Sequence, residues 1–164
     1  APLKHYSLDE WRRIMAVDLD GVFLVTREVG KQMVAQASGG SIVQTASIYG
    51  VMASDPRIYE GSSFKDYPIN NPAVYSAAKA GVVGLTRWLA TYWADKNIRV
   101  NAIAPGGTMA HENETFMRRY SNRVPMGRMA QSSEMVGAVV YLVSDASSYV
   151  TGQCLMIDGG LSAW

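Results

Sequence analysis

Tyr75 and Lys79 are the side chains whose types and spacing point most directly to proton transfer. They are four residues apart in a segment expected to be helical, so they share one helix face and lie about 6 Å apart along the axis. A free tyrosine has a pKa of about 10, but a nearby ammonium stabilises the phenolate and makes proton transfer near neutral pH feasible. Taken alone, this spacing is more often that of two unrelated surface residues.

The elements around this pair are expected to bring further groups to it. Residues 41–47 form a β-prone run between glycines, and residues 98–104 form a second one that ends at the proline-glycine-glycine turn 105–107. Ser47 lies at the end of the first run, and open α/β sheets bind ligands at the carboxyl ends of their strands. We therefore expect a hydroxyl, a phenol–ammonium pair and a glycine turn at one edge of a sheet.

Capping signals and hydrophobic periodicity predict the other elements. Ser7 and Glu10 have the spacing of a capping box at the start of a long helix, which we expect to be broken near Gly21. Asn71-Pro72 has the pattern of an N-cap followed by proline at the first helical position. We expect helices at 8–37, 72–96 and 133–144, and strands at 41–47, 98–104 and 154–157.

Side-chain patterns also predict how these helices pack and where the chain is irregular. The first helix carries an apolar stripe of Trp11, Met15, Val22, Val25, Val29 and Met33. The second carries a small-residue face of Ala77, Ala80, Gly81 and Gly84, which permits close approach of another backbone. Segments 51–71 and 109–123 lack a clean period and are expected to be a long surface excursion and a mobile polar segment.

Alternating strands and helices predict an α/β fold with a parallel sheet and right-handed crossovers. Only three strands are visible, which is few for a sheet covered on both faces. The chain contains no repeat, low-complexity tract or interdomain linker, so we expect residues 1–164 to form a single domain.

Composition excludes several classes of function. The 164 residues carry a net charge of +1, which gives no basic stripe for nucleic acid. The single cysteine, Cys154, excludes an internal disulfide and is compatible with a reducing compartment. No apolar run approaches the roughly 20 residues of a membrane span, so we expect a cytoplasmic protein without membrane contact. Charged residues make up only 18%, against a usual 25% or so, which favours a subunit interface.

Two other groups of residues favour ordinary structural roles. His5 and His111 are isolated, so no metal site is expected. Trp88, Tyr92 and Trp93 follow helical spacing, which favours a core or interface position over base stacking.

Four stretches together resemble the short-chain dehydrogenase/reductase family. They are Ser47-Ile-Tyr-Gly50, Tyr75-Ser-Ala-Ala-Lys79, Arg99-Val-Asn-Ala-Ile-Ala-Pro-Gly106 and Asp158-Gly-Gly160, and they follow the family's order across nearly the whole chain. The resemblance implies a Rossmann-like doubly wound parallel sheet. It further implies that this chain is the C-terminal catalytic part, with the family's first four strands missing.

The resemblance also assigns roles to individual residues. Tyr75 would be the general acid/base, Ser47 would hydrogen-bond the substrate oxygen, and Lys79 would hold the nicotinamide ribose and tune Tyr75. Asp18 stands where the family commonly has an asparagine that supports a proton relay towards the lysine. An aspartate could accept hydrogen bonds there, or it could pair with a local donor at a helix break.

The cofactor implied by the resemblance is NAD or NADP. Its nicotinamide end would contact Tyr75, Lys79, Pro105, Gly106 and the backbone of Thr108. The chain contains no Gly-x-Gly, so it lacks the glycine-rich turn that receives the pyrophosphate. In the family, helices such as those at 8–37 and 72–96 pair across subunits, which implies a homodimer or homotetramer.

The spacing from Ser47 to Tyr75 exceeds the family's usual spacing by roughly fifteen residues. The additional segment resembles an insertion in a branch of gluconate 5-dehydrogenase-like and sugar-modifying enzymes. Tyr49, Arg57, Tyr59 and Glu60 could bind a polyhydroxylated substrate there, or the segment could be a solvated loop or a subunit contact.

These observations lead to two hypotheses. The first is an NAD(P)-dependent oxidoreductase that acts on a secondary alcohol or ketone, such as a sugar or sugar acid, and that needs the missing nucleotide-binding half for activity. The alternative is a non-catalytic truncated module that retains the family's oligomerisation helices.

Overall fold

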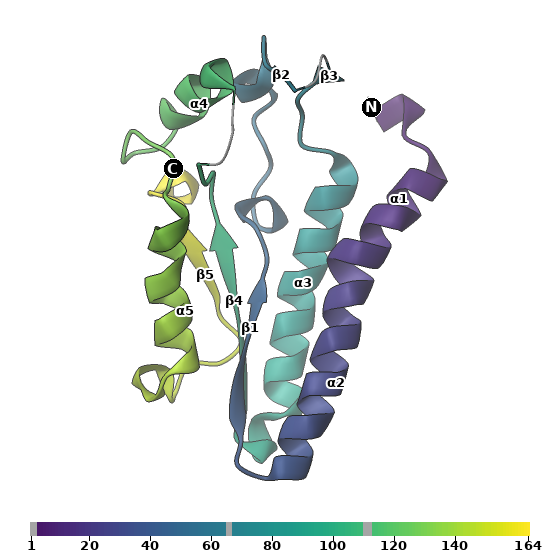
Figure 1. The fold of residues 1–164 in the computed structure, drawn as a ribbon, viewed down its shortest axis with the longest axis vertical. Coiled ribbons are helices and arrows are strands. Elements are labelled where there is room, and N and C mark those ends of the chain that lie inside the picture. The colour runs from purple at the N-terminus through teal and green to yellow at the C-terminus, as the bar shows by residue number, and fades with distance from the viewer. Residues whose placement is uncertain (1–2, 65–66, 110–112) are drawn as a thin grey trace.

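The computed structural model describes residues 3–64, 67–109 and 113–164 and shows an α/β arrangement in three layers (Figure 1). Helices α2 and α3 cover one face of a parallel sheet and α5 covers the other. The sheet has the order β1-β4-β5, with strands Gly40–Thr45, Ile98–Pro105 and Cys154–Ile157. The helices are α1 (Leu8–Met15), α2 (Gly21–Gln36), α3 (Ala73–Tyr92), α4 (Glu114–Ser121) and α5 (Val136–Val143). The expected α/β class, the three strands and their parallel pairing are confirmed.

The two crossovers of the sheet have opposite hands. The connection through α3 and the connection through α5 each move the chain one strand in the same direction, because β4 lies between β1 and β5. The two helices nevertheless lie on opposite faces (Figure 1). The expectation that both crossovers are right-handed is therefore wrong for one of them, although nearly all such connections are right-handed.

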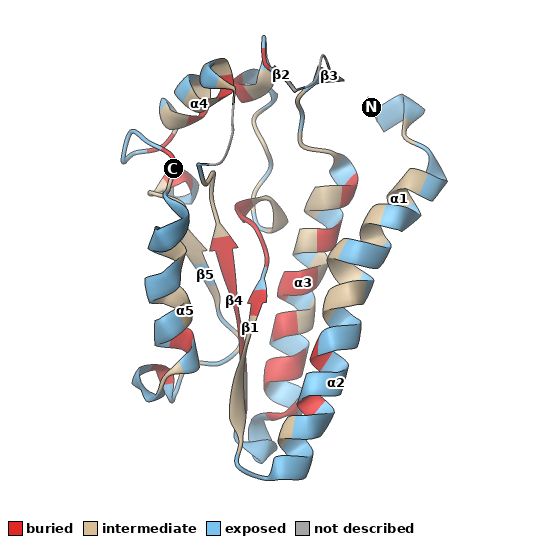
Figure 2. Cartoon of the chain, in the orientation of Figure 1, coloured by how far each residue is buried: buried red, intermediate tan, exposed pale blue. Residues whose placement is uncertain are grey.

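The core lies where α3 packs on the central strand. Buried residues are frequent along β4 and α3 (Figure 2). Val100, Ala102 and Ala104 of β4 are fully buried, and so are Val74 and Val82 of α3. These three β4 residues point to one face of the strand, and Ile103, 5% exposed, points to the other, as expected for a strand of a parallel sheet covered on both sides. This packing fixes the amino-terminal end of α3 beside the carboxyl ends of the strands.

The first long helix is interrupted where the sequence predicted a break. The Ser7 hydroxyl accepts a hydrogen bond from the Glu10 amide at 3.1 Å and caps α1. A π-helical turn at Ala16–Asp20 then precedes α2, which begins at Gly21. Extra-residue turns of this kind are frequent at functional sites.

The packed face of α2 differs from the predicted stripe. Val25 and Val29 are 65% and 40% exposed, whereas Thr26 and Gly30 are buried. Gly30 lies against the indole of Trp93, where an added Cβ would come within 2.1 Å of the ring. Close helix packing therefore favoured a small residue and a hydroxyl over the larger apolar side chains.

A buried hydrogen-bond network joins α2 and α3 to β1 of the sheet. The Gln44 amide of β1 donates to the Thr26 hydroxyl of α2 at 3.0 Å, and the Thr86 hydroxyl of α3 donates to Gln44 at 2.6 Å. Each of the three side chains is at most 5% exposed. Because each of these buried polar groups has a hydrogen-bond partner, the network fixes the two helices relative to the strand.

The small-residue face of α3 is used in part, as the sequence suggested. An added Cβ at Gly81 would come within 2.7 Å of Leu19, so this glycine admits the π-helical turn. Gly84 has open space around its Cα. On the same helix Trp88 and Tyr92 are exposed and stacked on each other, while Trp93 just beyond it is buried.

Two expectations are wrong, one for the segment 109–123 and one for the N-cap of α3. Part of the segment expected to be mobile forms α4, which the Asn113 side chain caps by accepting from the Thr115 amide at 2.9 Å. Pro72, not Asn71, occupies the N-cap position of α3. The excursion at 51–71 contains a 3-10 turn (Pro56–Tyr59) and the short antiparallel strands β2 (Ser63–Phe64) and β3 (Tyr67–Pro68).

Among the helices that the structure describes, none combines the length and the apolar character that crossing a bilayer requires.

Candidate active site

A cleft of about 400 Å³ opens at the carboxyl ends of β1 and β4, against the amino-terminal end of α3. Its lining includes Ser47, Tyr75 and Lys79 together with the turn at 105–108. The hydroxyl, the phenol–ammonium pair and the glycine turn therefore meet at one edge of the sheet, as the strand-end argument predicted.

Tyr75 and Lys79 lie together on the cleft side of α3. The Lys79 ammonium is 5.7 Å from the centroid of the Tyr75 ring. It also donates a hydrogen bond to the carbonyl of Thr45, the last residue of β1, at 3.2 Å. One of the three ammonium donors thus ties α3 to the strand end, and two remain for other groups.

Ser47 begins the turn that connects β1 to the outer part of the cleft. Its side chain is buried, and its hydroxyl accepts a hydrogen bond from the Tyr49 amide at 3.2 Å. The following 3-10 turn ends at Gly50, where an added Cβ would come within 2.6 Å of the Lys79 carbonyl carbon and oxygen. Only a glycine lets this turn lie directly on the helix backbone that carries Lys79.

The turn at 105–108 is held by a residue that the sequence did not single out. The Gly107 amide donates to the hydroxyl of Tyr120, a buried residue of α4, at 2.5 Å. An added Cβ at Gly107 would come within 2.5 Å of the Tyr120 ring, and Thr108 forms a parallel bridge with Ala130. The turn is therefore fixed between α4 and the segment that follows it.

Three tyrosines form the outer wall of the cleft. Tyr59 donates to the hydroxyl of Tyr49 at 3.2 Å, and its ring stacks on Phe116 of α4 with centroids 5.5 Å apart. Burial raises the pKa of Tyr49 and of Tyr59, and it raises the pKa of Tyr120 to about 12. All three therefore present neutral hydroxyl groups at physiological pH, which suit hydrogen bonding better than proton transfer.

The structure does not bring every predicted site residue to the cleft. Asp18 lies in the π-helical turn, half-buried, and is not part of the cleft lining. Of the inserted segment, Tyr59 lines the cleft, whereas Arg57 and Glu60 point to ion pairs outside it. The charged residues of this segment thus fasten the loop.

Two polar residues of the matching stretch at 99–106 have structural contacts. Arg99 donates to the carbonyls of Val150 and Ser144 at 3.1 and 3.2 Å. Asn101, fully buried, donates to the Val150 carbonyl at 2.9 Å and accepts from the Gln153 amide at 3.0 Å. They hold the loop before β5 against the central strand.

The terminal Asp158 shapes the turn after β5. Its carboxylate accepts from the amides of Gly160 and Ser162 at 3.0 and 2.8 Å. Burial alone would raise the pKa of Asp158, but these hydrogen bonds outweigh it and lower the pKa.

The described residues include no group of three or more histidine, cysteine, aspartate or glutamate side chains that could hold a metal ion. His5 is exposed, and His111 lies outside the described residues.

Comparisons with known proteins agree with this geometry. The model of the family described as enoyl-(acyl carrier protein) reductase matches residues 1–162. The chain is 36% identical to galactitol 2-dehydrogenase (L-tagatose-forming) of Cereibacter sphaeroides, over 94% of this chain and 58% of the relative.

Two solved structures are similar over nearly the whole chain. A short-chain dehydrogenase from Leptospira borgpetersenii, solved with bound NAD+, has a TM-score of 0.90 at 38% identity, covering 99% of this chain and 60% of that one. A gluconate 5-dehydrogenase from Burkholderia cenocepacia, in complex with NADP and tartrate, has a TM-score of 0.86 at 33% identity, covering 100% and 60%. The chain thus spans about 60% of the length of these relatives, and it belongs to the short-chain dehydrogenase/reductase family.

Proposed function

We propose that the protein containing this chain is an NAD(P)-dependent oxidoreductase that interconverts a secondary alcohol and a ketone, with Tyr75 as the general acid/base. The observation that carries the proposal is the meeting of Ser47, Tyr75 and Lys79 with the 105–108 turn in one cleft. Family membership supports it, because the relatives that match are dehydrogenases.

The chemistry assigned to these side chains is a proton transfer beside a hydride transfer. Ser47 hydrogen-bonds the substrate oxygen and orients it towards the Tyr75 hydroxyl. In the oxidative direction Tyr75 accepts the hydroxyl proton, and in the reductive direction it returns a proton to the carbonyl oxygen. A nicotinamide, when bound, supplies the acceptor or donor of the hydride. Lys79 holds the ribose, and its ammonium lies 5.7 Å from the centroid of the Tyr75 ring.

The residues of the cleft fit the nicotinamide–ribose end of such a cofactor. Two donors of Lys79 are available to ribose hydroxyls, and Pro105, Gly106 and the Thr108 backbone offer a surface largely free of bulky side chains. The pyrophosphate end requires a glycine-rich turn, and this chain has no Gly-x-Gly. We infer that Asp18, which lies outside the cleft lining, acts through the π-helical turn that packs on α3.

The substrate class proposed is a polyol or sugar acid. Tyr49 and Tyr59 line the outer wall with neutral hydroxyls, which can donate to and accept from a polyhydroxylated chain. The names of relatives, galactitol 2-dehydrogenase and gluconate 5-dehydrogenase, support this class. Glu60, paired with Arg119, is assigned to the support of this wall.

Association through helices 8–37 and 72–96 is part of the same proposal. Phe23 and Leu24 of α2 are 45% and 46% exposed, and the stacked Trp88 and Tyr92 of α3 are 58% and 60% exposed. Such apolar surfaces favour a homodimer or homotetramer. They equally suit the alternative, a non-catalytic module that keeps only the assembly helices.

A tyrosine substitution separates the two functions. In the full-length protein we expect Tyr75→Phe to lower turnover of a polyol by about 10²–10⁴-fold, the usual contribution of a general acid/base. Tyr141→Phe is the matched control, because Tyr141 lies on α5 and is 42% exposed. An unchanged rate in Tyr75→Phe would show that the assigned mechanism is wrong. A wild-type protein that assembles in light scattering but turns over no alcohol would favour the module.

A further inference from the structure

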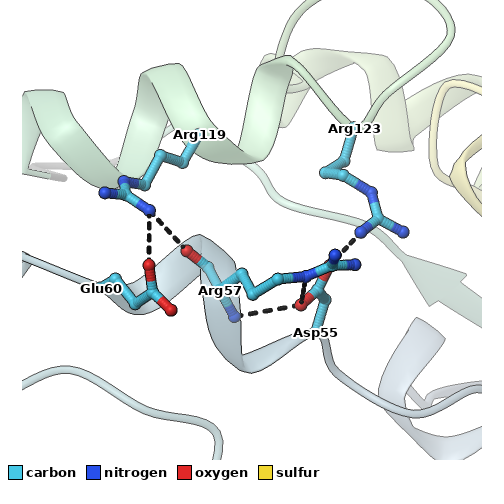
Figure 3. Close-up of polar contacts among 5 residues, drawn as sticks. All are labelled: Asp55, Arg57, Glu60, Arg119 and Arg123. Carbon is cyan, nitrogen blue, oxygen red and sulfur yellow. Dashed lines mark hydrogen bonds and ion pairs between the residues drawn. The ribbon is translucent and has the colours of Figure 1, made fainter.

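Ion pairs outside the cleft fasten its outer wall (Figure 3). Asp55 lies between two arginines. Arg57 donates to its carboxylate from Nε at 2.9 Å and from Nη2 at 2.8 Å, and Arg123 reaches it from just beyond α4. On α4 itself, Arg119 donates to the Arg57 carbonyl at 2.9 Å and to Glu60 at 3.1 Å. The inserted segment is therefore joined to the α4 region at two points.

Asp55 is the shared and most shielded member of this group. Its side chain is 17% exposed, compared with 74% for Arg57 and 42% for Arg123. The hydrogen bond from Arg57 lowers the pKa of Asp55 to about 2, so the carboxylate is charged at neutral pH. Asp55 also accepts from the Arg57 amide at 3.0 Å and so starts the 3-10 turn. Loss of its charge would leave two guanidinium groups facing a neutral partner.

The turn that Asp55 starts ends at a residue of the cleft. Tyr59 is the last residue of this turn; it stacks on Phe116 of α4 and donates to Tyr49. Any shift of the turn relative to α4 must therefore move the Tyr59 hydroxyl, its hydrogen bond or its stacking. The ion pairs hold this relative position together with an apolar contact, since Ile58 of the turn is buried in one cluster with Phe116 and Tyr120 of α4.

We propose that Asp55 is a positioning residue, which acts through Arg123 to hold the Pro56–Tyr59 turn against the α4 region and thereby sets the place of the Tyr59 hydroxyl in the cleft. This inference rests on the proposed function, because it places Tyr59 on the substrate side. Isolated exposed ion pairs contribute little, since solvent and salt screen them. Here one shielded carboxylate pairs with two guanidinium groups, so it holds the turn more firmly than a single exposed ion pair would.

The test is Asp55→Asn in the full-length protein, with galactitol or gluconate as substrate. We expect the KM for the substrate to rise about three- to five-fold, the range expected for loss of such a contact. The kcat and the KM for NAD(P) should stay within about two-fold of wild type. Amide hydrogen exchange of α4 should become faster, because the helix loses a tether. Arg123→Lys keeps the charge and should restore part of the substrate affinity that Arg123→Gln loses.

The matched control is Asp95→Asn. It removes the ion pair with Lys96, which lies just beyond the carboxyl end of α3 and away from the cleft. It should change neither the substrate KM nor the exchange of α4. Asp55→Asn values equal to those of this control would overturn the inference. Faster exchange with an unchanged substrate KM would overturn it as well, because α4 would then move without moving the substrate site. If the wild-type protein turns over no polyol, the proposed function is wrong. Unchanged hydrogen exchange of α4 in Asp55→Asn would show separately that Asp55 does not hold the turn against α4.

Discussion

Both walls of the cleft are packed on apolar side chains, but only the outer wall adds ion pairs among the described residues. The inner wall is built by β1, β4 and α3, where Val74 and Val82 are fully buried and Gly50 lies on the backbone of Lys79. The outer wall joins the inserted segment to α4 and the residues just after it through apolar packing of Ile58 and Tyr59 on Phe116, and through the ion pairs of Asp55 and Glu60. The residues assigned to proton transfer line the first wall, and those assigned to the substrate line the second.

This difference separates the residues assigned to proton transfer, whose geometry must be fixed, from those assigned to the substrate, whose position can be adjusted. Apolar packing and backbone contacts are dense and short-ranged, so they hold the side chains of the cleft in one geometry. Ion pairs near the surface are partly screened by solvent and salt, so they add less to the rigidity of the loop than buried packing does. We expect damage to the inner wall to affect stability and turnover together, and damage to the outer wall to affect mainly substrate affinity.

The largest effect on the inner wall is expected from Gly50→Ala. The added Cβ would come within 2.6 Å of the Lys79 carbonyl group, and backbone cannot move aside as a flexible side chain can. We expect a loss of about 1–3 kcal/mol in the free energy of unfolding, measured by urea denaturation, together with reduced turnover. Gly84→Ala is the control, since nothing lies within 4 Å of its added Cβ. It should be neutral or stabilise α3 by up to about 1 kcal/mol. Equal stabilities of the two variants would contradict the close contact.

An intermediate effect is expected from Tyr120→Phe, where the two walls meet. The variant keeps the ring but removes the hydroxyl that accepts from the Gly107 amide. We expect a loss of about 1 kcal/mol in the free energy of unfolding, and a rise in the KM for NAD(P) rather than for the polyol. Thermal unfolding and steady-state kinetics check the two parts. A rise confined to the polyol KM would place Tyr120 on the substrate side instead.

The smallest effect is expected from acid on the outer wall. The pKa of Asp55 is lowered to about 2 by its hydrogen bonds with Arg57, against an unfolded value near 3.9. A lowered folded pKa stabilises the native state above the unfolded value, and this contribution disappears as the pH falls from about 4 towards 2. The difference in unfolding temperature between wild type and Asp55→Asn should therefore shrink over this range. A difference that stays constant down to pH 2 would exclude the carboxylate charge as its source.

Local patterns in the sequence were enough to predict the inner wall. Tyr75 and Lys79 share a helix face because of helical periodicity alone, and the strand-end rule placed Ser47 beside them. The strands were predicted nearly to the residue, with 154–157 matching β5. The resemblance to the family was confirmed by the comparisons.

Residues whose roles depend on long-range contacts could not be predicted. Tyr120 lies in a segment without apolar periodicity, and its importance follows only from its approach to Gly107. On α2 the apolar stripe favoured Val25 and Val29, but packing against Trp93 requires the small Gly30. Periodicity records the types of residue on a face, whereas burial depends on the shape of the partner surface.

The sequence by itself determined the α/β class, the parallel strands and the meeting of Ser47, Tyr75 and Lys79 at one edge of the sheet, because these follow from periodicities and from a topological rule. Only the tertiary structure decided the opposite hands of the two crossovers and the ion pairs that join the inserted segment to the residues around α4. The contact of Asp55 with Arg123 spans 68 residues of sequence, and no local pattern encodes a meeting of that kind. The fold brings the two charges together, and their attraction then fixes the wall.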